Sequence, residues 1–197
     1  MKAMDERKKS MFEAGELLLS ERLLNNIAAI ERTYRESPEE YAAAFSDAIQ
    51  VLLARVALAQ AQSDKGPLRY IYVSFLQSSL YTGNYEICID AYDERLFGDL
   101  TDTHAYWSPD FIFRYIKDDM AHFRKHIGQH VLRVREHEIM AFFAQYVQHY
   151  YRIVQTLVTE LIEPIVAAET SDTRELTVIF GEYMEQGVVL SETGQVG

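Results

Sequence analysis

The chain contains one cysteine, four prolines and nine glycines in 197 residues. A single Cys88 cannot form an internal disulfide or supply a cysteine-rich zinc site. The apolar stretch of a secretory signal is also missing after Met1 and Lys2. We therefore expect a cytoplasmic protein. No repeat of fixed period, low-complexity tract or linker divides the chain, so we expect one globular domain over residues 1–197.

Positive charge is scarce, and this excludes a class of function. Nineteen Lys and Arg against thirty Asp and Glu give a net charge of −11. Such a chain repels phosphates, so we do not expect general nucleic-acid binding. Long apolar runs are absent as well. The most apolar stretch, residues 48–61, is interrupted by Gln50, Arg55 and Gln60, and we expect no membrane span.

Several catalytic motifs are also missing. The chain has no Gly-x-Ser-x-Gly elbow, no Gly-x-Gly-x-x-Gly loop and no Walker-type loop. What it does have is apolar and aromatic side chains: 48% hydrophobic residues, thirteen Tyr and ten Phe. This composition predicts a compact core. The tyrosines gather in the middle third, where they serve either core packing or a binding surface.

Helical spacing covers the first sixty residues. Leu23, Ile27, Ile30 and Tyr34 recur at i, i+4, i+7 and i+11 within a helix expected over residues 5–34. The run Ser37-Pro38-Glu39-Glu40 then predicts a helix start with a capping box. The alanines of this second helix favour close packing against a neighbouring helix. Residues 63–67, which include Gly66 and Pro67, end it.

The segment from residue 68 to residue 92 has two readings. Residues 68–80 suit either a helix that starts at Pro67 or a strand rich in aromatic and β-branched side chains. Tyr85, Ile87 and Ile89 alternate with polar residues and indicate a half-buried strand. A lone strand needs a partner, so a hairpin turning at residues 82–84 is attractive.

The second half of the chain again predicts helices. Ser108-Pro109-Asp110 follows a loop expected over residues 93–107 and starts a helical block that reaches residue 162, with a break near Gly128 or around Arg135. Pro164 disrupts it. A last helix is expected over residues 176–183, stopped by Gly187, and residues 188–197 should fray. The fold class is therefore mainly α, an irregular bundle with a small β element around residues 70–92.

Four of the six histidines lie on one side of the expected helix after Ser108. They are His122, His126, His130 and His137. At 100° per residue they fall on the shoulder of the apolar face, together with Asp119. Imidazole is the commonest metal ligand, and an i, i+4 pair with a carboxylate one turn earlier can chelate a divalent cation. We therefore name a candidate site, Asp119, His122, His126 and His130, for zinc, iron, manganese or nickel. The alternative is that these are amphipathic side chains at a helix shoulder, with no ligand role.

The acidic run around residues 90–102 invites a calcium interpretation. An EF-hand loop that starts at Asp93 would place Gly98 correctly, but Arg95 and Phe97 occupy ligand positions. We therefore expect a solvated acidic loop. Cys88, in the neighbouring strand, is expected to be a buried and inert thiol.

Three hypotheses on function follow. The first is a cytoplasmic interaction or regulatory, ligand-binding module without catalysis, which forms a homo-oligomer or binds a partner protein through its amphipathic helices. The second is a metal-binding protein or metal-dependent enzyme that uses the histidines. The third is a helical transcription regulator, for which the basic N-terminal residues give weak support; these are Lys2, Arg7, Lys8 and Lys9. It is opposed by the lack of a short Gly-containing turn in the first fifty residues.

Overall fold

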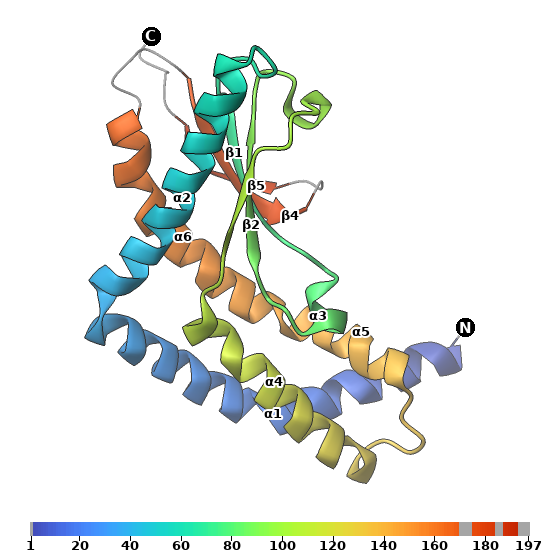
Figure 1. The fold of residues 1–197 in the computed structure, drawn as a ribbon. Coiled ribbons are helices and arrows are strands. Elements are labelled where there is room, and N and C mark those ends of the chain that lie inside the picture. Colours follow the sequence, from blue (N-terminus) through green and yellow to red (C-terminus); the bar gives the residue numbers. More distant parts are fainter. Residues whose placement is uncertain (1, 170–174, 184–186, 193–197) are drawn as a thin grey trace.

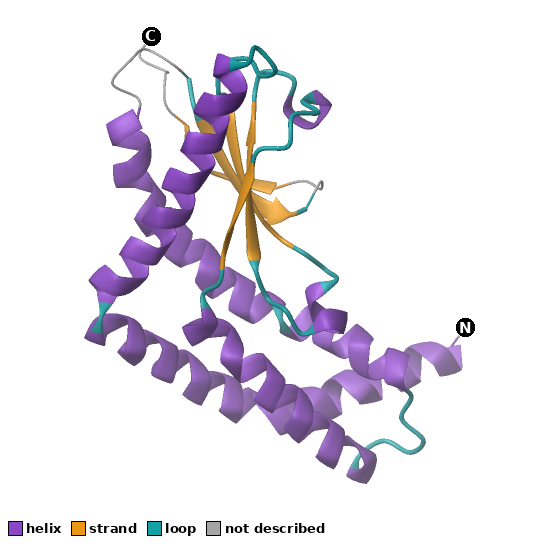
Figure 2. Ribbon diagram, in the orientation of Figure 1, coloured by secondary structure: helices purple, strands orange, loops and turns teal. Residues whose placement is uncertain are grey.

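A computed structural model describes residues 2–169, 175–183 and 187–192. These residues are mainly helical with a small mixed sheet, so the expected fold class is confirmed (Figure 1 and Figure 2). The α-helices are α1 (Lys2–Glu36), α2 (Pro38–Ala61), α3 (Ser79–Thr82), α4 (Asp110–His126), α5 (Glu136–Tyr146) and α6 (Gln148–Glu169). Two short 3₁₀ turns are η1 (Leu96–Gly98) and η2 (Ile127–Gln129). The strands are β1 (Tyr70–Phe75), β2 (Ile87–Tyr92), β3 (His104–Trp107), β4 (Thr177–Glu182) and β5 (Gly187–Glu192).

The sheet joins distant parts of the chain. Its strand order is β3-β2-β1-β4-β5. Neighbouring strands are antiparallel except β1 and β4, which run parallel with Tyr70 opposite Thr177. The expected hairpin is confirmed as β1–β2, although its connection holds α3 and closes with Gly83 in the left-handed region at φ 70°. Of residues 68–80, residues 70–75 are therefore strand, while residues 79–80 begin the short helix α3.

One face of the sheet packs on the helices. Alternate strand residues, such as Val73, Ile89 and Val178, are fully buried in the main core. α2 crosses this face along β2 and β3, and α6 passes beneath it, where Phe75 and Tyr151 stack at 3.9 Å between ring centroids. The remaining helices extend the molecule away from the sheet, with α1 crossing α4 (Figure 1). The opposite face of the sheet is partly covered by η1, whose Phe97 contacts Tyr72 and Tyr92.

Several sequence predictions of secondary structure were wrong. Residues 176–183 form strand β4 rather than a helix, because the open edge of β1 offers it a full ladder of hydrogen bonds. The expected loop at 93–107 contains β3, and the expected loose tail contains β5, while residues 193–197 lie outside the described part. Pro164 does not end α6, since it lies on the exposed side, where water can satisfy the carbonyl that loses its partner. Ser37 precedes α2 but makes no side-chain cap hydrogen bond.

Candidate functional site

Asp119, the carboxylate of the expected metal site, is fully buried between α1, α4, α5 and α6. Its oxygens accept hydrogen bonds from four donors, which are Arg22 Nε at 2.9 Å, Asn26 Nδ2 at 2.9 Å, Tyr146 Oη at 2.6 Å and Tyr150 Oη at 2.7 Å. Burial and these bonds to Asp119 raise the pKa of both tyrosines above the ordinary range. Four donors satisfy a buried carboxylate, so this group ties helices together rather than presenting a free ligand.

His122 and His126 stand next to each other on α4, with ring centroids 4.5 Å apart. Both are half-buried, which is the shoulder position expected from the helical wheel. Desolvation, with the nearby Arg22 charge, lowers the pKa of His122. The neutral ring this favours is the form that binds a metal.

His130 and His137 do not extend the pair along one helix. α4 ends at His126, η2 follows, and a turn separates it from α5, so the break expected near Gly128 is present. Both side chains are exposed. Within the residues described, no three His, Cys, Asp or Glu side chains are grouped so that they could hold a metal ion. Metal binding by Asp119, His122, His126 and His130 stays a prediction.

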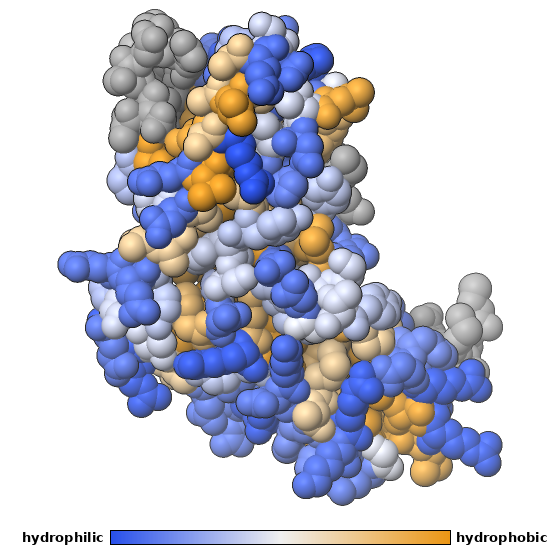
Figure 3. Space-filling model, viewed as in Figure 1, coloured by the Kyte–Doolittle hydropathy of each residue, from blue (hydrophilic) through white to orange (hydrophobic). Residues whose placement is uncertain are grey.

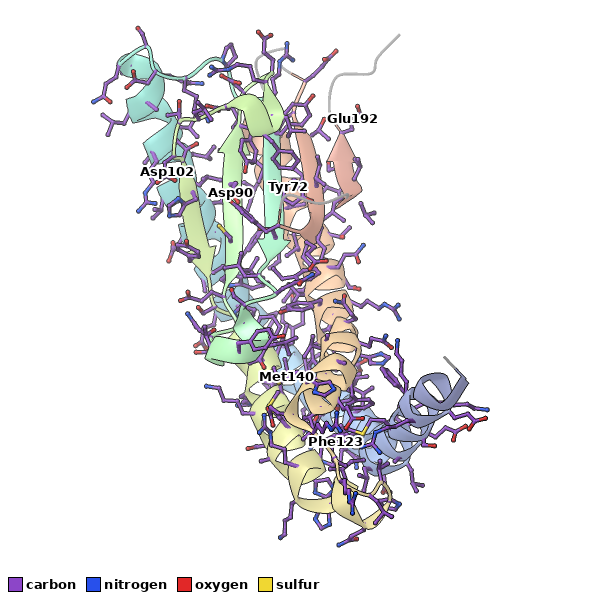
Figure 4. The ribbon with its side chains drawn as sticks, turned by 90° about the vertical axis from the view of Figure 1, so that its right-hand side faces the viewer. Tyr72, Asp90, Asp102, Phe123, Met140 and Glu192 are labelled. Atoms are coloured by element: carbon purple, nitrogen blue, oxygen red, sulfur yellow. The ribbon has the colours of Figure 1, made fainter. Side chains whose placement is uncertain are left out.

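A second polar group lies on the face of the sheet opposite the helices. Tyr72, Asp90 and His104 occupy matching positions on β1, β2 and β3, and Figure 4 shows Asp102, Asp90 and Tyr72 in a row. His104 Nδ1 lies 2.6 Å from Asp102 Oδ1. Asp90 Oδ2 is buried, and burial raises the pKa of this carboxyl while the neighbouring Cys88 thiol opposes the shift.

Cys88 lies two residues before Asp90 on β2, and its side chain is on the same face of the sheet. Burial and the neighbouring Asp90 charge raise the pKa of its thiol to about 12. A thiol with this pKa is protonated at neutral pH, whereas nucleophilic catalysis requires the thiolate. Cys88 is buried as expected, and its surroundings favour the protonated thiol.

The acidic loop is solvated only in part, because Glu94 and Asp102 are exposed whereas two other carboxylates are not. Asp93 and Asp99 are buried, with 2% and 6% exposure. Lys65 pairs with Asp99 and also donates to the carbonyl of Ala91 at 2.7 Å, while Arg95 pairs with Asp93. The Arg95 guanidinium holds the pKa of Asp93 well below its usual range. Backbone amides of residues 93, 95 and 101 complete the set, so these carboxylates fix the loop and are not open to a cation.

The outward side of α2 carries exposed apolar side chains. α2 buries one side against the core through Phe45, Ile49 and Leu52. A second apolar stripe faces away from the core. Its members are all exposed and spaced three and four residues apart, and they are Ala44, Asp47, Val51, Ala54, Leu58 and Ala61. We call these six residues the outer seam. In Figure 3 apolar side chains are visible over α2 in the upper left.

The exposure of the outer seam is large for apolar side chains. Val51 is 49% exposed and Leu58 is 61% exposed. By the ordinary 100° per residue, the outer seam is centred about 140° away from the core side of α2. The helix is thus apolar on two sides, whereas a helix on the surface of a globular protein is normally polar on its outer side.

Length and composition alone would let α2 cross a membrane. Its 24 residues include an 18-residue window with mean hydropathy 1.5, of which 33% is buried inside the protein. Residues 48–61, on which the expectation of no membrane span rested, are only part of this apolar helix. Asp47 and Arg55 both lie within this helix, and each would cost about 2.5–3.5 kcal/mol near the centre of a bilayer.

Cavities occur elsewhere and are lined mainly by apolar side chains. One of about 430 Å³ lies between α1, α4 and α6, beside Tyr34 and Phe111. Another of about 490 Å³ lies between α1 and α5, beside Phe12 and Tyr146. The first is also lined by Glu31, Arg35, Thr156 and Glu160, and the second by Glu16, Ser20, Gln145 and His149.

Comparisons with known proteins add no assignment. No family model, curated protein or solved structure matches the chain. The outer seam of α2 is therefore the candidate site on the strength of its own geometry. Sequence reasoning missed it because the helix was assigned a single buried side, although the spacing of Ala44, Val51 and Leu58 at i, i+7 and i+14 was available.

Proposed function

We propose that this protein is a non-catalytic interaction module that docks an apolar helix on the outer seam of α2. The observation that carries the proposal is the pair of large aliphatic side chains, Val51 and Leu58, held in the open one above the other on a rigid helix. Fully burying a Val or Leu side chain contributes roughly 1.5–3 kcal/mol. The alanines between them allow a second helix to approach closely, as expected from the sequence.

The charge distribution supports docking at this helix. From Tyr41 to Ala61 the sequence carries only Asp47 and Arg55, so this stretch is neutral in a chain of net charge −11. Asp47 is the one charged member of the outer seam, and Arg55 is next to the seam in the sequence. Exposed apolar side chains grouped on one element, rather than scattered, are typical of protein–protein interfaces.

The other hypotheses receive less support. A catalytic role would require a reactive group, but Asp119 is saturated by donors and Cys88 is held protonated. A transcription regulator would require a helix-turn-helix, and the first fifty described residues fold as two long helices, α1 and part of α2. We retain a cytoplasmic location as part of the proposal.

The test compares two double variants in the binding of Nile red, a neutral dye that brightens in apolar contacts. Val51→Ser with Leu58→Ser removes the aliphatic part of the outer seam. Leu17→Ser with Leu24→Ser is the matched control, because these leucines of α1 have the same spacing and are 70% and 67% exposed. Measurements are made at a dilution at which sedimentation shows the monomer.

We expect the wild-type protein and the α1 control to bind the dye similarly, and the α2 variant to lose most of the signal. Equal signals from all three proteins would contradict an open apolar docking face on α2. Circular dichroism of each variant checks that the fold is kept, which we expect because all four substituted side chains are exposed.

A further inference from the structure

We infer that the partner of the outer seam is a second copy of this chain, with the two α2 helices packed antiparallel. This inference rests on the proposed function, because it names the occupant of the same surface. It follows from the positions of Asp47 and Arg55, the two charged residues between Tyr41 and Ala61. A parallel and an antiparallel pair of helices would bring these charges together in different ways.

The outer seam has the spacing of a helix–helix interface. Its positions alternate by three and four residues over residues 44–61, which is the a/d pattern of a coiled coil. At 1.5 Å per residue this stretch is about 26 Å long. These six positions can pack against a second helix that has the same spacing. The α2 helix of a second copy has this spacing and needs no change in structure to pack there.

Asp47 decides between the two possible directions. A parallel pair would place Asp47 of each copy beside Asp47 of the other, inside the seam, where like charges repel. An antiparallel pair centred between Val51 and Ala54 places Asp47 near Leu58 of the second copy and within one helical turn of its Arg55. Arg55 is exposed, its guanidinium donates to the carbonyl of His104 on β3, and by 100° per residue its position lies about 70° from the centre of the outer seam.

Symmetry makes this arrangement self-consistent. In an antiparallel two-fold pair each contact occurs twice, so the Asp47–Arg55 proximity is formed at both ends. Ala44 of one copy then lies opposite Ala61 of the other, and these small residues let the helices approach closely at both ends. The neutral stretch from Tyr41 to Ala61 is where two chains of charge −11 can meet with the least repulsion.

The size of the interface sets the expected strength. One helix pair of this length is smaller than a standard protein interface, which buries about 800 Å² on each partner. We therefore expect a reversible dimer with a dissociation constant on the order of micromolar. Sedimentation equilibrium across a concentration series measures it. Val51→Ser with Leu58→Ser should give a monomer throughout, and the α1 control, Leu17→Ser with Leu24→Ser, should dimerise like the wild type.

Direction is tested by disulfide trapping with Ala44→Cys and Ala61→Cys. The two variants are mixed, and each is also oxidised alone with copper phenanthroline. The native Cys88 is buried and its thiol is protonated, so wild-type protein is the control and should give no cross-link. In a parallel pair, positions 44 and 61 of the two copies would be about 25 Å apart along the axis, far beyond the reach of a disulfide.

We expect the mixture to form the mixed disulfide and each variant alone to remain uncross-linked. The antiparallel arrangement would be overturned if each variant formed a disulfide-linked dimer with itself and the two variants formed none with each other. As a second measurement, Asp47→Asn should weaken the antiparallel dimer about two- to fivefold, since the ion pair with Arg55, which lies at the solvent-exposed edge of the seam, contributes little. In a parallel dimer the same substitution would strengthen association by relieving the repulsion.

Two outcomes separate this inference from the proposed function. A monomer at all concentrations with no cross-link, while Nile red binding still depends on Val51 and Leu58, would overturn the second copy and leave a docking face for another protein. Flotation of the wild type with phosphatidylcholine vesicles, lost in the α2 variant but kept in the α1 control, would assign the face to a membrane and overturn both.

Discussion

Removing the Asp119 carboxylate should be among the most damaging single changes in this protein. Asp119→Ala leaves the hydroxyls of Tyr146 and Tyr150 without their carboxylate acceptor at a fully buried position, while the amide of Asn26 keeps only its bond to the Tyr150 hydroxyl. It also leaves the Arg22 guanidinium, which is 37% exposed, without its counter-ion. Breaking a buried, hydrogen-bonded charge pair from one side typically costs about 3–5 kcal/mol, and we expect a loss of stability of that size.

Urea unfolding followed by far-ultraviolet circular dichroism measures the effect. Asp118→Ala is the matched control, because Asp118 is the adjacent residue on α4 and is exposed. It should change the free energy of unfolding by no more than about 0.5 kcal/mol. Asp119→Asn keeps the shape and should fall between the two. A loss below about 1 kcal/mol for Asp119→Ala would refute the reasoning, because a network of four bonds to a buried charge cannot be worth so little.

Three further predictions concern packing, pH and metal. Gly15→Ala should destabilise the protein by about 1–3 kcal/mol, because the added Cβ would lie 2.2 Å from the buried Phe142 ring. Gly128→Ala, where a Cβ meets none of the described atoms within 4 Å, is the control, and urea unfolding measures both. Stability should fall as pH rises above about 10, since Tyr146 and Tyr150 ionise in the unfolded chain but stay protonated in the fold, and Tyr150→Phe should flatten the curve. Added zinc should raise the melting temperature only slightly, because His122 and His126 supply two of the four ligands of a typical zinc site. Stoichiometric zinc by mass spectrometry, lost in His122→Ala, would contradict this last expectation.

The sequence predicted the helical part of the fold well, for a physical reason. Long amphipathic segments such as α1 and α4 carry their own periodicity, and breaks such as Gly128 are local. The sheet was harder to predict. Residues 176–183 have apolar side chains that suit either a helix or a strand, and the choice depends on β1, about a hundred residues earlier in the chain.

The candidate sites, too, could be predicted from the sequence only in part. The wheel correctly predicted half-buried positions for His122 and His126, but it could not show that four donors from other helices surround Asp119. Arg22 and Asn26 on α1 carry no signal in their own sequence that links them to residue 119. Likewise, the burial of Asp93 and Asp99 depends on Lys65 and Arg95 folding back onto the loop.

The parallel pairing of β1 with β4 has a consequence for synthesis of the chain. β1 can pair with β2 as soon as the hairpin emerges from the ribosome, but its other edge stays open until residues 177–182 have been made. At 5–20 residues per second that delay is roughly 5–20 s for about a hundred residues. During this time a buried strand exposes a full row of unpaired amides and carbonyls, which is a template for aggregation. A nascent chain stalled before β4 should therefore be the form of this protein that most needs a chaperone.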